Sequence, residues 1–216
     1  MKNLMCYGDS NTWGAIPRKH IDDIRRYPVN QRWVGVLQHE LRNEYSVVAE
    51  GLRGRTTVFD DPIEGKHKNG LSTLIPCLES NSPLDLVILF LGTNDLKSRF
   101  SISAKEIALG IGVLIYTINQ SNTGVNGMPP KILVLAPPPV SKLTFFADIF
   151  DGAVEKSKQL APEFESVARK YNCLFFDTAE IIKSSDIDGI HFESQEHYKL
   201  GKRVAQIIRG YERTAS

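Results

Sequence analysis

The segment Gly8-Asp9-Ser10-Asn11-Thr12-Trp13-Gly14 has residues that could present a reactive hydroxyl. It follows a short apolar run, Leu4 to Tyr7, which predicts a strand, so Ser10 would stand at that strand's carboxyl end. Gly8 permits a tight turn, and the first N–H groups of a helix beginning after Ser10 would stabilise negative charge beside the hydroxyl. An ordinary helix cap would use the same residue types, so this segment alone leaves both readings open.

A serine hydroxyl is a weak nucleophile until a base removes its proton, and a third group must orient that base. His191 is the candidate base, because the short segment Asp188-Gly189-Ile190-His191 lets Asp188 reach the imidazole. Asp9 is expected to brace its own loop instead. Asp-Gly is also a plain turn signal, so a structural role for this segment stays open. The other histidines fall in polar loops or on helices: His20, His39, His67 and His197.

Two further polar segments follow predicted strands. Gly92-Thr93-Asn94-Asp95 offers the Asn94 side-chain N–H to an oxyanion, and such preorganised donors are a large catalytic term in acyl transfer. The segment from Glu50 to Thr57 contains Gly51 and Gly54, whose backbones can approach a substrate closely. Lys97, three residues past Asn94, either lines the same pocket or faces solvent.

The remaining pattern predicts the elements that position these segments. Short apolar runs alternate with helical periodicity, which is typical of a doubly wound α/β domain with ligands beyond the carboxyl ends of its strands. Two connections, 15–31 and 137–151, are longer than a crossover requires and are expected to wall the site or make a subunit contact. The predicted strands are Leu4 to Tyr7, Tyr45 to Ala49, Leu86 to Leu91, Ile132 to Ala136 and Cys173 to Phe176. Helical stripes begin at Trp33, Ile107 and Val154, and a last helix begins near Ser194.

Composition narrows the classes of protein. The 216 residues suit one domain, 1–216, and a net charge of +1 gives no broad field for nucleic acid or an anionic membrane. Two basic clusters, Arg18-Lys19-His20 and Lys66-His67-Lys68, are interpreted as solvated loops because acidic residues stand nearby. The three cysteines lack a paired spacing and are expected to be reduced core thiols. No signal peptide or apolar run of about 18 residues is evident, so a cytoplasmic location is expected.

In their order along the chain, the four segments resemble the sequence blocks of SGNH hydrolases over about 180 of the 216 residues: G-D-S, a glycine after the second strand, G-x-N-D, and D-x-x-H. The resemblance implies a flavodoxin-like three-layer α/β/α sandwich with a five-stranded parallel sheet. It also implies a triad of Ser10, Asp188 and His191, and an oxyanion hole from the Ser10 and Gly54 N–H groups and the Asn94 side chain. Candidate pocket residues are Asn11, Trp13, Thr93, Lys97 and Ile190.

Longer motifs resemble the arylesterase and acyltransferase branch of that family: G-D-S-x-T-W-G, E-G-L-x-x-R-T-T, D-D-P, L-G-T-N-D-x-K and D-G-I-H-F. This branch implies small acyl groups and, in some members, oligomers. Ala15 stands where transferase-like members carry a bulky aromatic residue, which argues for weaker water exclusion and weaker acyl transfer. A homo-oligomer is expected through the two long connections, burying Trp33, Phe145 and Phe146.

The expected function is therefore hydrolysis of small-molecule esters through an acyl-enzyme on Ser10, with no metal or organic cofactor required. Deacetylation of sugars and hydrolysis of thioesters are alternatives that the same machinery could perform. A non-enzymatic alternative is a flavodoxin-like module that binds flavin or phosphate. Against it, the chain has neither G-x-G-x-x-G nor G-x-x-x-x-G-K-[ST], and a phosphate site has no need of Asp188 with His191.

Overall fold

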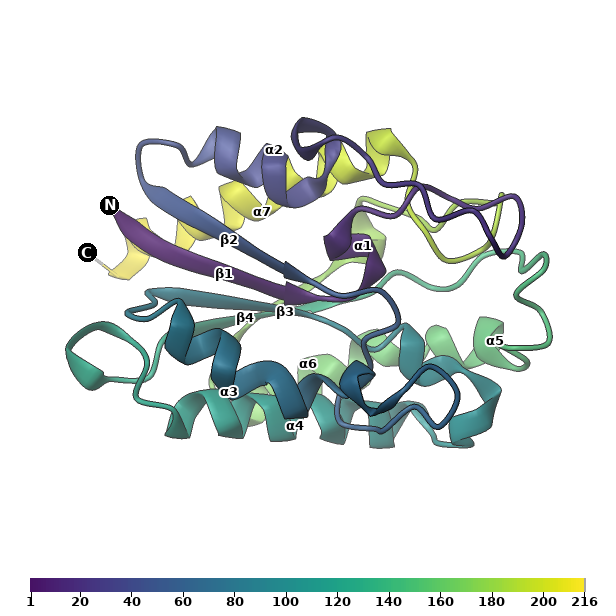
Figure 1. Ribbon diagram of the computed structural model, residues 1–216. Helices are drawn as coiled ribbons and strands as arrows, with labels where there is room; N and C mark the ends of the chain where they lie inside the picture. Colours follow the sequence, from purple (N-terminus) through teal and green to yellow (C-terminus); the bar gives the residue numbers. More distant parts are fainter. Residues whose placement is uncertain (216) are drawn as a thin grey trace.

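A five-stranded parallel sheet runs through the computed structural model, which describes residues 1–215 (Figure 1). The strand order is β2-β1-β3-β4-β5. The chain therefore adds β2 on one side of β1 and then crosses back to add β3, β4 and β5 in turn on the other side of β1. This reversal creates a switch point between β1 and β3, where ligands of such sheets usually bind. The strands are β1 (Lys2–Gly8), β2 (Tyr45–Gly51), β3 (Leu86–Phe90), β4 (Lys131–Ala136) and β5 (Leu174–Asp177). The predicted doubly wound fold is confirmed.

Helices cover both faces of this sheet. In β1, Leu4 and Cys6 enter the core beneath α2 and α7, whereas Met5 and Tyr7 enter the core on the opposite face. Because both faces are buried, the strands are continuous apolar runs rather than alternating ones. Figure 1 shows α2 (Trp33–Glu40) and α7 (Ser194–Ala215) on one side, with α3 (Gly70–Ser80), α4 (Ala104–Gln120) and α6 (Leu160–Lys170) on the other.

Proline explains two differences from the predicted helices. Helix α3 was not predicted, and its sequence contains Pro76, which weakens any helical signal because proline lacks the backbone N–H. The single stripe beginning at Val154 is two helices, α5 (Ala153–Ser157) and α6. In a continuous helix the ring of Pro162 would clash with the carbonyl of Lys158, whereas proline is tolerated in the first turn of α6.

Trp33 belongs to the core of the chain itself. Its side chain is fully buried and packs edge-to-face on Phe90 of β3 at 6.0 Å between ring centroids. Phe146 is also buried within the chain, and Phe145 is partly buried against it. The expectation that a single chain would leave these aromatic residues in water is therefore wrong for Trp33 and Phe146.

The carboxyl ends of the strands meet the short helix α1 (Ser10–Trp13) and the long connections, whereas the start of β1 and the last turns of α7 lie on the opposite side of the fold (Figure 1). As predicted, Cys6, Cys77 and Cys173 are free, with Cys6 buried and the other two partly buried. In residues 1–215, none of the helices combines the length and the apolar character needed to cross a membrane.

Candidate active site

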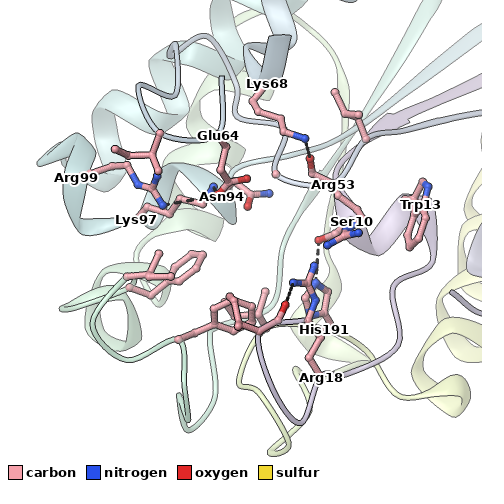
Figure 2. A pocket seen from close by; sticks show the side chains of 18 residues that line it. Ser10, Trp13, Arg18, Arg53, Glu64, Lys68, Asn94, Lys97, Arg99 and His191 are labelled. Atoms are coloured by element: carbon pink, nitrogen blue, oxygen red, sulfur yellow. Dashed lines mark hydrogen bonds and ion pairs between the residues drawn. The ribbon is translucent and has the colours of Figure 1, made fainter. Parts of the chain in front are cut away.

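Three side chains from distant parts of the sequence form a line of hydrogen bonds at the carboxyl edge of the sheet (Figure 2 shows its serine and histidine). Ser10 Oγ lies 3.1 Å from His191 Nε2, and His191 Nδ1 lies 2.7 Å from Asp188 Oδ2. All three are buried. An imidazole held between a hydroxyl and a carboxylate has the arrangement needed to accept the hydroxyl proton.

The local turn explains why Asp188 reaches His191. Asp188 Oδ1 accepts hydrogen bonds from the backbone N–H groups of Ile190 and His191, at 3.0 and 2.9 Å. Gly189 has φ +84°, and a Cβ there would lie 2.9 Å from the Lys142 carbonyl oxygen, so the turn requires glycine. Burial alone would raise the pKa of the Asp188 carboxyl, but hydrogen bonds and the attraction of His191 hold it below its usual value.

Asp9 and Asp95 fasten the loops around the serine. Asp9 accepts from the Asn11 backbone N–H at 2.9 Å, which confirms its predicted bracing role. Asp95 accepts from the Thr57 backbone N–H at 2.9 Å and from its hydroxyl at 2.5 Å, joining the loop after β3 to the loop after β2. Burial raises the pKa of Asp9 to about 7 and that of Asp95 to about 6.

The joined loops bring Asn94 and Gly54 to the cavity that contains Ser10. Asn94 Nδ2 donates to the Arg55 carbonyl at 3.1 Å, which orients the amide and leaves its second N–H for another acceptor. Gly54 has φ +78°, and a Cβ at this position would lie 2.3 Å from Glu64 Oε2. The positive φ of this turn, rather than the movable end of the Glu64 side chain, favours glycine here.

A cavity of about 620 Å³ opens over Ser10 and His191. Both long connections contribute to it, as predicted: Arg18 and Ile21 come from the first, Phe146 and Ile149 from the second. The centroids of the Phe146 and His191 rings are 6.2 Å apart, so Phe146 covers one side of the imidazole. The remaining lining residues are Trp13, Leu52, Arg53, Gly54, Ile63, Glu64, Lys68, Asn94, Lys97, Arg99, Phe150 and Ile190.

Lys97 enters a buried ion-pair network at one side of this cavity. Its ammonium group lies 3.1 Å from Asp61 Oδ2 and also contacts Glu64, while Arg99 lies 3.0 Å from Asp61 Oδ1. Asp61 is fully buried and Lys97 nearly so. Of the two readings left open for Lys97, the pocket position is the observed one.

The predicted pocket residues are only partly brought together. Trp13, Lys97 and Ile190 line the cavity, whereas Asn11 and Thr93 are buried outside its lining. The amide of Asn11 donates to the Ile190 carbonyl at 3.3 Å. Thr93 instead supports the turn after β3, where its carbonyl accepts from the Leu96 N–H.

The interpretation of the two basic clusters as solvated loops is wrong for one member of each. Arg18 is buried, Lys68 is partly buried, and both line the cavity. Their neighbours Lys19, His20, Lys66 and His67 are exposed, as expected. Arg53 also lines the cavity but was not predicted to do so, although it stands within the segment from Glu50 to Thr57. A cation between Gly51 and Gly54 is the signal that could have identified it.

A doubly wound sheet of this order, with a serine, a histidine and an aspartate hydrogen-bonded at its switch point, has the fold of an SGNH hydrolase. The chain belongs to the GDSL-like lipase/acylhydrolase family, which it matches over residues 6–197. It is a carboxylic ester hydrolase. No match was found among curated proteins.

Solved structures with strong similarity to this chain include esterases. The native aryl esterase of M. smegmatis is 38% identical, with 97% of this chain and 99% of that chain covered and a TM-score of 0.93. Est24, a carbohydrate acetylesterase from Sinorhizobium meliloti, is 39% identical, with 98% and 100% covered and a TM-score of 0.93. A second carbohydrate acetylesterase family member from Sinorhizobium meliloti is 34% identical, with 97% and 98% covered and a TM-score of 0.89.

Proposed function

We propose that this esterase hydrolyses esters of small acyl groups through an acyl-enzyme formed on Ser10. Ser10 Oγ attacks the ester carbonyl while His191 takes its proton and then passes it to the departing alcohol. Water next attacks the acyl-enzyme, with His191 again accepting a proton, and the acid leaves as the Ser10 hydroxyl is restored. Asp188 keeps the imidazole in the required orientation. The observation that carries this proposal is the hydrogen-bonded line from Ser10 through His191 to Asp188, opening into the cavity.

The same proposal assigns the oxyanion hole to the backbone N–H groups of Ser10 and Gly54 and to the Asn94 side chain. In acyl transfer, the carbonyl oxygen becomes negatively charged as the tetrahedral intermediate forms, and fixed N–H donors stabilise it. The presence of Ser10, Gly54 and Asn94 around one cavity supports this assignment. The hydrogen bond from Asn94 to Arg55 preorganises the donor.

Aryl esters and acetylated sugars are the two substrate classes that the named relatives suggest. Small aryl acetates suit the apolar part of the cavity formed by Phe146, Ile149 and Phe150, and we expect them to be substrates. Sugar acetates are the second candidate, because the cavity also presents many polar side chains. A series of aryl esters of increasing acyl length, with an acetylated sugar and a thioester beside it, separates these classes.

The decisive test of the proposal is Ser10→Ala combined with covalent labelling. Loss of the attacking hydroxyl is expected to lower kcat by up to ~10⁶ while circular dichroism shows an unchanged fold. An organophosphonate should add to the wild-type chain at Ser10, located by mass spectrometry of peptides. A folded Ser10→Ala variant that keeps more than half of the esterase rate would exclude this nucleophile.

We further infer that copies of this chain associate through the connections at 15–31 and 137–151, and that some acyl transfer to alcohols accompanies hydrolysis. Exposed apolar side chains support an assembly: Ile21 and Ile24 in the first connection are 54% and 63% exposed. Light scattering measures the mass, and the ratio of new ester to acid on adding a primary alcohol measures transfer. A monomer that forms no transfer product would overturn this inference and leave the Ser10 mechanism intact.

A further inference from the structure

Three cations line the ester cavity without a carboxylate partner. Arg18, Arg53 and Lys68 belong to its lining, yet none of them forms an ion pair within the part of the chain that the structure describes. Unpaired cations that line a cavity are costly because burial removes water that would otherwise solvate them. Their positive charge is the feature of this cavity that ester hydrolysis does not use.

The other two cations of the cavity are neutralised locally. Lys97 and Arg99 share the carboxylates of Asp61 and Glu64. Figure 2 shows Lys97, Arg99 and Glu64 together on one side, away from Ser10 and His191. Glu64 is the single carboxylate of the lining, and Lys97 and Arg99 already bind it. Glu64 also attracts Lys68, and Asp188, Asp23 and Glu64 attract Arg18, but none of these carboxylates lies within ion-pair distance of Arg18, Arg53 or Lys68.

Each of the three side chains is held at the cavity. Arg18 donates to the Ile21 carbonyl at 3.4 Å, and its guanidinium lies 5.7 Å from the centre of the Phe146 ring. The Arg53 guanidinium lies 5.4 Å from the Trp13 ring, and its Nε is buried with no hydrogen-bond partner among the described residues. Lys68 Nζ donates to the Arg53 carbonyl at 2.8 Å, which ties the ammonium group to the same loop.

The cations also act on one another. Burial lowers the pKa of the Arg18 guanidinium, and the charge of Arg53 lowers it further, against the weaker attraction of Asp188, Asp23 and Glu64. Burial likewise lowers the pKa of Lys68; Glu64 opposes this shift, and the repulsion of Arg53, Lys97 and Arg55 adds to it. A bound anion would relieve this repulsion and fill the unused donors, most of all the forked N–H groups of the two arginines.

We propose that the ester substrate of this enzyme carries an anionic group, a carboxylate or a phosphate, which Arg18, Arg53 and Lys68 bind while the ester bond lies at Ser10. This rests on the proposed function, since it names the substrate class of the same site. A neutral sugar acetate or simple aryl ester would leave all three cations without an ion-pair partner among the described residues. The inference therefore selects acylated acids or acylated phosphates from among the small esters.

The kinetic test compares 4-acetoxybenzoate with its neutral methyl ester, and adds 4-acetoxyphenyl phosphate as the phosphate arm. For Arg53→Gln, kcat/KM for the anionic esters should fall at least about ten-fold more than kcat/KM for the neutral one, because a charge-assisted hydrogen bond is lost. Each substrate is compared with itself between two proteins, so differences in intrinsic reactivity cancel. The larger of the two anionic losses identifies carboxylate or phosphate as the preferred group.

Two further variants separate charge from packing. Selectivity here is the ratio of kcat/KM for the anionic ester to kcat/KM for the neutral ester. Arg53→Lys keeps the charge and should recover part of this ratio, whereas Lys68→Gln should lower the ratio as Arg53→Gln does. Arg169→Gln is the matched control, because it removes one positive charge from the last turn of α6, at the sheet edge opposite the cavity. Raising the salt concentration should lower this ratio in the wild type, because salt screens the attraction between the cations and the anionic ester. The same change in salt should alter the ratio little in Arg53→Gln.

A binding measurement keeps this proposal separate from the catalytic one. Calorimetric titration with 4-hydroxybenzoate and with neutral 4-hydroxybenzamide requires no turnover, and the wild type should bind the anion at least about ten-fold more tightly. Failure to prefer the anion, or an equal loss for both esters in Arg53→Gln, overturns the proposal even if esters are hydrolysed. Preference for the anion by a chain that hydrolyses no ester would instead sink the proposed function and leave the anion site standing.

Discussion

Asp188 Oδ2 accepts a hydrogen bond at 2.7 Å from the backbone N–H of Arg18, and the same oxygen lies 2.7 Å from His191 Nδ1. The first long connection therefore supports the acid of the proposed triad through its backbone, while the Arg18 side chain lines the cavity. The hydrogen bond and charge of the His191 side chain, with smaller contributions from the Arg18 and Ile190 N–H groups, overcome the effect of burial and keep the pKa of Asp188 low.

The pH dependence of kcat/KM follows from this arrangement. Because the pKa of Asp188 is lowered, its carboxylate stays ionised as the pH falls, whereas Asp9 and Asp95, with pKa values raised by burial to about 7 and about 6, take up protons and alter the loops around Ser10. We expect kcat/KM to rise with pH between about 5 and 8, since a histidine base must be neutral to accept the Ser10 proton. A profile that is flat over this range, measured with a neutral aryl acetate, would argue against a histidine base.

Asp188→Asn should lower kcat by about 10⁴-fold. Asparagine keeps the shape of the turn, but its amide cannot hold the imidazole in the tautomer that accepts the Ser10 proton. Steady-state rates on one aryl acetate measure the loss, and thermal unfolding checks that the variant is folded. A loss below about ten-fold would mean that Asp188 only supports the turn.

Asn94→Ala should reduce kcat by about 10² to 10³, as expected for one of several oxyanion donors. Asn94→Asp is the matched comparison, since it keeps the side-chain volume but replaces the donor with an acceptor. Both variants should lose kcat with little change in KM. Recovery of the rate in Asn94→Asp would show that the volume of the side chain matters rather than its N–H.

Asp61→Asn should lower the free energy of unfolding by about 3 kcal/mol, because it leaves the buried Lys97 ammonium without a full counter-charge. Glu155→Gln is the control: it removes the partner of Lys158 in an exposed pair, where a loss within about 0.5 kcal/mol is expected. Urea unfolding at pH 7 measures both. Equal losses would show that burial of the Lys97 pair has no energetic consequence.

His197 predicts how stability depends on pH. Its side chain is fully buried, its Nδ1 accepts from the Trp33 N–H at 3.3 Å, and burial lowers its pKa to about 3. The unfolded chain, with a histidine pKa near ~6.5, binds this proton more tightly than the folded chain does. The contribution of neutral His197 to the free energy of unfolding is therefore fully present above about pH 6.5. It is lost as the pH falls below that value, by ~1.4 kcal/mol per pH unit.

The corresponding variant is His197→Asn, which keeps an acceptor near the Trp33 N–H but does not titrate. Its free energy of unfolding should fall less steeply between about pH 6.5 and 4.5 than that of the wild type. Urea unfolding at several pH values gives the two slopes. His39→Asn, at an exposed position of α2, should leave the slope unchanged. Parallel slopes for wild type and His197→Asn would contradict the assigned burial effect.

Sequence alone predicted the sheet and the positions of Ser10, Asn94 and His191 because each lies at the end of an apolar strand or beside a turn. Such signals are local, and the parallel topology brings the strand ends together. The environments of Arg18 and Lys68 could not be read in this way. Whether a lysine or arginine faces water depends on segments distant in the sequence, and here Phe146 and the Arg53 carbonyl supply those contacts.

The helices also could be predicted from the sequence only where the local signal was clear. Regular apolar periodicity predicted α4, whose capping box at Ser103 and Glu106 adds a clear start. Pro76 obscured α3, and Pro162 divided what the stripe of apolar residues suggested was one helix. Trp33 was misplaced for a different reason: a large aromatic residue fits a core and an interface equally well until the position of α7 is known.

Lys2 at the start of β1 pairs with Glu212 near the end of α7, and the Tyr45 hydroxyl donates to the same carboxylate at 2.6 Å. The two ends of the fold are therefore neighbours at the edge remote from Ser10 (Figure 1). A peptide linker could join them, and new ends could be opened at Asn126 and Gly127, in an exposed loop between α4 and β4. Such a circular permutant would keep the cavity intact, because the start of β1 and the last turns of α7 lie remote from Ser10 (Figure 1).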